Sequence, residues 1–117
     1  MTYKRTDRVN TLIRHELQQL IQREVKDPRV GFATVTDVET TPDLRHAKVF
    51  VSVMGTDEEA NTTITALHAA RAFLRHELAG RITMRRIPEL EFTRDRTLDR
   101  AMRIDQLLRE ANRGESQ

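Results

Sequence analysis

The residues with the clearest chemical potential are arginines gathered in one stretch of the chain. Residues 71–86 carry five arginines against a single acidic residue, Glu77. The five are Arg71, Arg75, Arg81, Arg85 and Arg86. A guanidinium is planar and can hold a phosphate group through two parallel hydrogen bonds, which a lysine ammonium does less well. The stretch therefore predicts a surface that binds phosphate groups.

The clustering of charge, rather than its total, supports this prediction. The whole chain has a net charge of only +2, and residues 1–60 carry nine basic against ten acidic side chains. Seventeen of the twenty basic residues are arginine, an excess that GC-rich coding would explain equally well. A coding bias does not explain why the arginines gather in one stretch, so their distribution is the informative feature.

The other residues that could do chemistry form no recognisable site. The four histidines, His15, His46, His68 and His76, include no His-x-x-x-His pair, so we expect surface positions and no metal. The sequence also has no nucleophile elbow, no phosphate-binding Gly-Lys-Ser/Thr loop and no dinucleotide motif. We therefore expect no catalytic residues, no enzymatic activity, no cofactor and no small-molecule substrate.

Length and composition favour one soluble domain. A chain of 117 residues with 38% hydrophobic and 32% charged residues has enough apolar side chains for one core. It contains no cysteine, no signal-peptide pattern in its first seven residues, and no apolar run near the ~20 residues of a membrane span. We expect a single domain over residues 1–117 in the cytoplasm, with residues 1–5 and 112–117 flexible.

A helix and a strand hairpin are predicted first along the chain. Apolar residues at three- and four-residue steps predict a helix from Thr6 to about Glu24, which Asp27-Pro28 terminates. Its apolar positions are Val9, Leu12, Ile13, Leu17, Leu20 and Ile21. Strands are then expected at Phe32–Glu39 and 47–54, joined by a turn at residues 40–43. The second strand should place Ala47, Val49, Val51 and Val53 on one face and Lys48, Phe50, Ser52 and Met54 on the other.

The next helix poses a problem of phase. Thr56 to Glu59 has the spacing of a capping box, so a helix should start near Asp57 and bury a stripe of Ala60, Ile64 and Leu67. An unbroken helix would place Arg71 on that stripe, and burial of an unpaired charge costs several kcal/mol. Either Arg71 reaches solvent from the edge of the stripe, or the helix bends near residues 70–72 and restarts with Phe73, Leu74 and Leu78 facing the core. We favour the bend.

One strand and one helix complete the predicted order. Gly80 is a plausible helix C-cap, and Glu89–Arg94 reads as a strand with Leu90 and Phe92 facing inward. Thr97 can cap a last helix, and Asn112 to Gln117 resembles a frayed tail. The stripe of that helix comprises Leu98, Ala101, Ile104, Leu108 and Ala111. The order helix, strand, strand, bent helix, strand, helix predicts an α+β fold with one sheet covered by helices.

Several short segments stand out over roughly residues 5 to 110. They are Arg8-Val9, Lys26-Asp27-Pro28-Arg29, Asp43-Leu44-Arg45-His46-Ala47-Lys48-Val49, Phe73-Leu74-Arg75 and Arg85-Arg86-Ile87-Pro88-Glu89-Leu90-Glu91-Phe92. No one of them is specific alone, but together, in this order and spacing, they resemble the ribosome-binding factor A family.

The resemblance implies a fold and a role. Members of the family look like type II KH domains, α-β-β-α(kink)α-β-α, in which helices cover one face of a three-stranded sheet and a helix-kink-helix replaces the usual Gly-x-x-Gly loop. They bind the free small (30S) ribosomal subunit during late maturation and processing of the 5′ end of its 16S RNA. The family kink reads Ala-x-Gly, and here the positions are Ala70, Arg71 and Ala72, so the glycine is missing and we expect a gentler bend.

The partner implied by the resemblance is 16S rRNA within the 30S subunit. We expect the protein to bind it as a monomer, and we expect no association with a membrane. Contact should rest mainly on phosphate, through the five arginines, with Arg45 and Lys48 as second-rank candidates, although some of them can instead pair with Glu77 or Glu89. The five aromatic residues are Tyr3, Phe32, Phe50, Phe73 and Phe92, and because most are expected to pack inward we expect no stacking platform. Two other functions stay open: a DNA-binding regulator that uses one helix, and a protein-protein adaptor that uses an exposed sheet edge.

Overall fold

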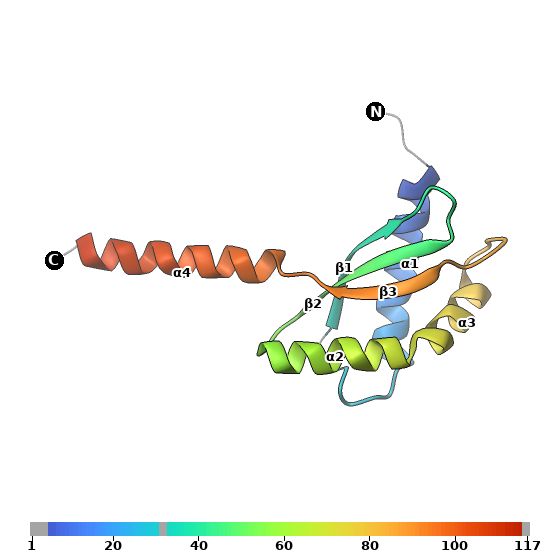
Figure 1. Cartoon of the computed structure of the whole chain (residues 1–117), viewed down its shortest axis with the longest axis horizontal. Helices are drawn as coiled ribbons and strands as arrows, with labels where there is room; N and C mark the ends of the chain where they lie inside the picture. Colours follow the sequence, from blue (N-terminus) through green and yellow to red (C-terminus); the bar gives the residue numbers. More distant parts are fainter. Residues whose placement is uncertain (1–4, 31–32, 116–117) are drawn as a thin grey trace.

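The computed structural model describes residues 5–30 and 33–115, apart from the side chains of residues 98–102 and 113–115. The elements are α1 (Arg5–Arg23), β1 (Ala33–Thr40), β2 (His46–Val53), α2 (Asp57–Ala69), α3 (Arg71–Arg81), β3 (Glu89–Arg94) and α4 (Thr97–Glu115). Their order is the predicted one, and Figure 1 shows one sheet with α1, α2 and α3 packed on it. No helix within these residues has the length and apolar character needed to cross a membrane.

The sheet has the strand order β1-β2-β3, with β1 antiparallel and β3 parallel to the central strand β2. The predicted hairpin is therefore confirmed, with one irregularity in register between Val35 and Asp37. Alternation along β2 buries Val49 and Val51 completely, whereas Lys48 is exposed and Phe50 is half-buried on the opposite face. Phe32 lies outside the described residues.

The core lies between one face of the sheet and three helices. In α1 the buried side chains are Ile13, Leu17, Leu20 and Ile21, as the periodicity predicted. Leu12 was expected on the same stripe but is 42% exposed, because it lies at the edge of the stripe, and Val9 is only partly buried. From β3, Leu90 and Phe92 face this core as predicted.

The long helix is broken at Ala70. The backbone of Ala70 leaves the helical region, with φ −88° and ψ 1°, and its N–H is shared between the carbonyls of Ala66 and Leu67. After the break Leu74 and Leu78 are fully buried and Arg71 is exposed, as the phase argument required. Phe73 was expected to face the core, but it is 41% exposed because the buried stripe of α3 runs through residues 74 and 78 alone.

Side chains from the helices occupy both edges of the sheet. Along β1, the amide oxygen of Gln18 accepts from Val35 N–H at 2.6 Å, and that of Asn10 accepts from Thr40 N–H at 2.9 Å. Along β3, Nε2 of His68 accepts from Phe92 N–H at 3.1 Å. An open edge offers unpaired backbone groups to other chains, so these bonds reduce the capacity of this sheet to add a strand.

One of three predicted helix ends agrees with expectation and two differ in detail. Thr56 caps α2 as predicted, since its hydroxyl accepts from Glu59 N–H at 3.1 Å. Gly80 is not a cap, because α3 continues to Arg81. At the start of α4 the carboxylate of Asp95, rather than Thr97, accepts a hydrogen bond, from Thr97 N–H at 2.9 Å.

The last helix extends away from the sheet (Figure 1), which contributes to the 63 Å long axis of the molecule. It continues to Glu115 and so includes residues that were expected to form a frayed tail. Of its predicted apolar stripe, Ile104 and Leu108 are 58% and 59% exposed and Ala111 is exposed, whereas the side chains of Leu98 and Ala101 lie outside the described residues. The periodicity was correct for a helix, but the described members of the stripe, Ile104, Leu108 and Ala111, do not join the core.

The edge contact of α1 with β1 can be tested at Gln18. We expect Gln18→Ala to lower the free energy of unfolding by about 1–2 kcal/mol, because Val35 N–H loses its partner in a part-buried place. Gln22→Ala, one turn further along the same helix and exposed, should change it by less than about 0.5 kcal/mol. Urea unfolding followed by circular dichroism measures both, and equal effects of the two substitutions would contradict this role.

Acid should weaken the junction between β1 and α4. The hydrogen bonds that Asp95 accepts, first from the Thr36 hydroxyl and then from Thr97 N–H, hold the pKa of its carboxyl below the usual value. A carboxyl with a lowered folded-state pKa stabilises the fold above its unfolded pKa of about 4, and this stabilisation is lost as the pH falls through the folded value. Urea midpoints at pH 7 and pH 3 should therefore differ less in Asp95→Asn and in Thr36→Val than in the wild type. An unaltered difference in both variants would refute this assignment.

Candidate nucleic-acid interface

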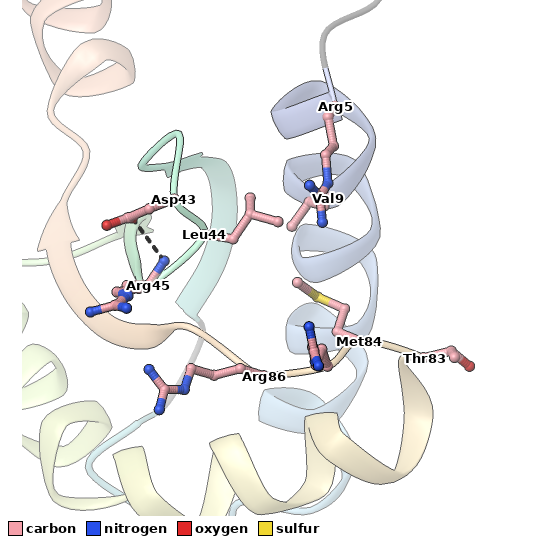
Figure 2. A pocket seen from close by; sticks show the side chains of 9 residues that line it. Arg5, Val9, Asp43, Leu44, Arg45, Thr83, Met84 and Arg86 are labelled. Carbon is pink, nitrogen blue, oxygen red and sulfur yellow. Dashed lines mark hydrogen bonds between the residues drawn. The ribbon is translucent and has the colours of Figure 1, made fainter.

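A groove of about 790 Å³ opens where three segments of the chain meet. These segments are the start of α1, the β1–β2 turn and the α3–β3 loop (residues 82–88). The groove is lined by Arg5, Val9, Asp43, Leu44, Arg45, Thr83, Met84, Arg85 and Arg86 (Figure 2). Residues far apart in the sequence thus form one basic surface.

Four arginines surround the groove and one acid lies among them. Arg5, Arg45, Arg85 and Arg86 are all exposed. The carboxylate of Asp43 accepts hydrogen bonds from the Thr41 hydroxyl at 2.6 Å and from Arg45 N–H at 3.1 Å. Led by the bond from Thr41, these contacts lower the pKa of Asp43. Asp43 therefore holds the turn in shape and offsets only part of the positive charge.

The floor of the groove is apolar. Figure 2 shows Leu44 of the turn pointing toward Val9 of α1, with Met84 of the α3–β3 loop beside them. Leu44 has a φ of +60°, a left-handed conformation that is costly for a leucine. A hydrogen bond from Leu44 N–H to the Thr41 carbonyl, 2.8 Å long, closes the turn. The turn thus keeps an apolar side chain in a strained place at the centre of the basic surface.

The positive surface continues beyond the groove in two smaller hollows. The first shares Arg45 and Arg86 with the groove and adds Arg75 and His46. The second shares His46 and reaches Lys48 and Arg71, near the break between α2 and α3. We call the whole surface the basic track; its basic side chains are Arg5, Arg45, Lys48, Arg71, Arg75, Arg85 and Arg86, and its acidic ones are Asp43, Glu89 and Glu91.

Arg75 differs from the other candidates that line the basic track, because its guanidinium is already engaged within the protein. Its Nη2 donates to the Ile87 carbonyl at 2.8 Å and its Nε to the Pro88 carbonyl at 3.1 Å, while Nη1 pairs with Glu89 at 3.1 Å. The pairing with Glu89 is the alternative that the sequence left open. Arg75 therefore positions the α3–β3 loop, and with it Arg85 and Arg86, from within the track.

Arg81 is the one candidate that the structure leaves outside the basic track. Its Nη1 lies 3.6 Å from Oε2 of Glu16 on α1, so it joins α3 to α1. The remaining candidates, Arg71, Arg85, Arg86, Arg45 and Lys48, all line the track. Of the predicted kink, Ala70 carries the break, and Arg71 and Ala72 already belong to α3. Ala72 is not among the described residues with a positive φ.

Sequence reasoning missed three residues of this surface. Arg5 precedes the arginine-rich stretch by more than sixty positions, and only the packing of α1 beside the loop brings it to the groove. His46 was grouped with surface histidines, yet it lines both smaller hollows. Leu44 was noted only within the segment that carries the resemblance, since nothing in the sequence marks a leucine with a positive φ.

Two expectations about ring side chains need correction. Most of the aromatic residues were expected to pack inward, but Phe73 is 41% exposed, and Phe50 is half-buried on the open face of the sheet. The ammonium of Lys48 lies 5.9 Å from the centre of the Phe50 ring. His68 is half-buried rather than on the surface, with its ring 5.8 Å from that of Phe92.

The fold and this surface define a small KH type II-like domain with an arginine-lined face. The model of the ribosome-binding factor A family matches residues 5–108. The chain belongs to the ribosome-binding factor A family.

Curated relatives match along most of the chain. Ribosome-binding factor A of Thermodesulfovibrio yellowstonii is 48% identical over 108 residues, which is 92% of this chain and 91% of the relative. That of Aromatoleum aromaticum is 48% identical over 106 residues, which is 91% of this chain and 84% of the relative.

Solved structures agree with this membership. The crystal structure of ribosome-binding factor A from Thermus thermophilus has a TM-score of 0.71 at 30% identity, covering 79% of this chain and 97% of that one. A homology model of the Thermus thermophilus factor, fitted into the cryo-EM map of a complex of that factor with 30S, has a TM-score of 0.62 at 34% identity, covering 74% of this chain and 90% of that one. The KH-like fold implied by the resemblance is therefore confirmed.

The positioning role of Arg75 can be separated from its charge. Arg75→Lys keeps the positive charge but cannot make the same forked contacts with Ile87 and Pro88, so we expect a loss of about 1–3 kcal/mol in the free energy of unfolding. Arg71→Lys, at an exposed position of the same helix, should cost less than about 0.5 kcal/mol. Thermal and urea unfolding report both values. If Arg75→Lys were as stable as the wild type, the loop would not depend on this guanidinium.

Proposed function

We propose that this protein binds the free 30S ribosomal subunit through its basic track and promotes late maturation of that subunit. The observation that carries the proposal is the convergence of arginines from α1, the β1–β2 turn and the α3–β3 loop on one surface. Arginine is suited to bind phosphate oxygens, and phosphate contacts provide much of the affinity of proteins for nucleic acids. The partner is then 16S rRNA within the subunit, and a ribosomal partner implies a cytoplasmic location.

The finer role is assistance to processing of the 5′ end of the 16S rRNA, without catalysis of the cleavage. The basic track offers groups that bind phosphate, and neither a nucleophile with its base nor a set of metal ligands was recognised in the sequence. A protein of this kind acts by stabilising one fold of the RNA, which exposes or protects a site for a nuclease. The basic track lies on a single domain, so a monomer is sufficient for this role.

The structure favours RNA over the two alternative functions. An adaptor that adds a strand needs a free sheet edge, but Gln18, Asn10 and His68 occupy backbone groups at both edges. A regulator that reads the major groove needs an exposed recognition helix, but three of the four arginines around the groove, Arg45, Arg85 and Arg86, lie on loops. Neither alternative accounts for the basic track.

Charge reversal within the basic track tests the proposal. We expect Arg45→Glu combined with Arg86→Glu to weaken cosedimentation with purified 30S subunits at least about tenfold, because two phosphate contacts become repulsive. The matched control is Arg14→Glu with Arg23→Glu, which makes the same change of charge on exposed positions of α1 outside the track. The control pair should lose much less affinity. If the two double variants lost equal affinity for 30S subunits, the change of net charge alone would explain the loss, and this would contradict the proposed surface.

The salt dependence of binding gives an independent measure. If about five phosphates are neutralised, the logarithm of affinity should fall with the logarithm of salt concentration at a slope of roughly −3.5 to −4.5. Arg45→Ala combined with Arg86→Ala should reduce the steepness by about 1.5. A flat salt response of the wild type would argue against phosphate as the ligand.

A further inference from the structure

We infer that the groove beside Leu44 is a pocket for one unpaired nucleotide, with its base on the apolar floor and its flanking phosphates on the surrounding arginines. The inference rests on the proposed function and specifies which part of an RNA this surface takes. It concerns a place apart from the helix break, since none of the residues that line the groove belongs to the kink at Ala70, Arg71 and Ala72.

The first argument is the combination of surfaces within the groove. A site that touched only the backbone of a duplex would need charge and hydrogen-bond donors, but no apolar floor. Here the half-buried side chains of Val9, Leu44 and Met84 face one another between the arginines (Figure 2). An apolar floor gains free energy when an apolar group, such as the face of a base, displaces water from it.

The second argument is charge. Arg5, Arg45, Arg85 and Arg86 stand around this floor, and the single carboxylate in the groove, Asp43, is engaged with Thr41 and with the backbone of Arg45. One nucleotide with its two flanking phosphates brings at least two negative charges and one flat base. Guanidinium groups suit both parts, since they bind phosphate oxygens and also stack on bases.

The third argument is the backbone of the turn. Leu44 has a φ of +60°, where glycine, not leucine, is the favoured residue. Strained residues persist where the surrounding structure holds them, and they gather at binding sites. The strain here serves to direct the leucine side chain toward Val9, over the groove.

These features favour unpaired RNA over a duplex. In a duplex both faces of each base are stacked on neighbouring bases and are not available to a protein surface. Sequence-specific contacts of proteins with RNA are accordingly made mostly in single-stranded loops, bulges and ends. The pocket would let the protein recognise a segment of rRNA that is still unpaired, which is a chemical difference between an immature and a mature fold.

Leu44→Gly is the informative substitution. Glycine adopts a positive φ without strain, so the turn should keep its shape while the floor loses its central side chain. The probes are two fluorescein-labelled RNAs of equal length and therefore of equal phosphate number: one without self-complementary segments, and one hairpin in which only the bases of a minimal loop are unpaired. Fluorescence anisotropy with the full chain measures both affinities. Met54→Ala, at a 72% exposed methionine away from the groove, is the control.

We expect the wild type to bind the single strand at least about tenfold more tightly than the hairpin. Leu44→Gly should weaken single-strand binding by about five- to tenfold, leave hairpin binding unchanged, and unfold at the same or a higher urea concentration. Met54→Ala should behave as the wild type. Equal affinity for the two probes, or no effect of Leu44→Gly, would overturn the nucleotide pocket.

The outcomes separate this inference from the proposed function. If the wild type binds both probes equally but still cosediments with 30S subunits, the nucleotide pocket is wrong and the ribosomal role stands. If the wild type does not cosediment with 30S subunits, the ribosomal role is wrong, whatever the short probes show.

Discussion

An arginine that cannot be buried determines how the second half of this chain folds. Continued in phase, the helix that begins at Asp57 would carry Arg71 into the core, where an unpaired guanidinium costs several kcal/mol out of a total stability of about 5–15 kcal/mol. The break at Ala70 removes the conflict, since Arg71 becomes exposed while Leu74 and Leu78 are fully buried. Alanine accommodates this break because its backbone there keeps a negative φ of −88°, so the left-handed conformation that favours glycine is not needed.

The same change of phase builds the candidate site. Once α3 is turned onto the core, Arg75 lies beside the α3–β3 loop and binds the carbonyls of Ile87 and Pro88. That loop then presents Arg85 and Arg86 next to Arg45 of the β1–β2 turn. The assembly of the basic track therefore depends on how the helices and loops pack together. The clustering of charged residues along the sequence reveals only part of it.

Periodicity was sufficient for the elements and for most of the core. Alternation in β2 and four of the six predicted stripe positions of α1 were read correctly, because both elements lie directly on the core, where the pattern and the burial coincide. Prediction failed where burial depends on distant parts of the chain. Phe73 sits beside the stripe of α3, and Ile104 and Leu108 belong to an amphipathic helix that points away from the sheet.

The sequence indicated that the candidate site is rich in arginine, but not how the arginines are arranged in space. Of the arginine-rich stretch, Arg71, Arg85 and Arg86 line the basic track, whereas Arg81 lies outside it and pairs with Glu16. Local charge cannot distinguish an arginine that faces a ligand from one that joins two helices. The contribution of Arg5 and the conformation of Leu44 depend on contacts between segments that no local pattern reports.

The most direct test of the central claim, that the basic track faces ribosomal RNA, is directed hydroxyl-radical probing. The chain has no cysteine, so a single one can be introduced at Thr83, an exposed residue of the groove, and carry a tethered iron chelate. In complexes with purified 30S subunits, radicals from position 83 should cleave a small set of neighbouring 16S rRNA positions, whereas radicals from a cysteine at Gln22, outside the track, should cleave them weakly. Equal cleavage from both positions, or strong cleavage from position 22 alone, would contradict the account.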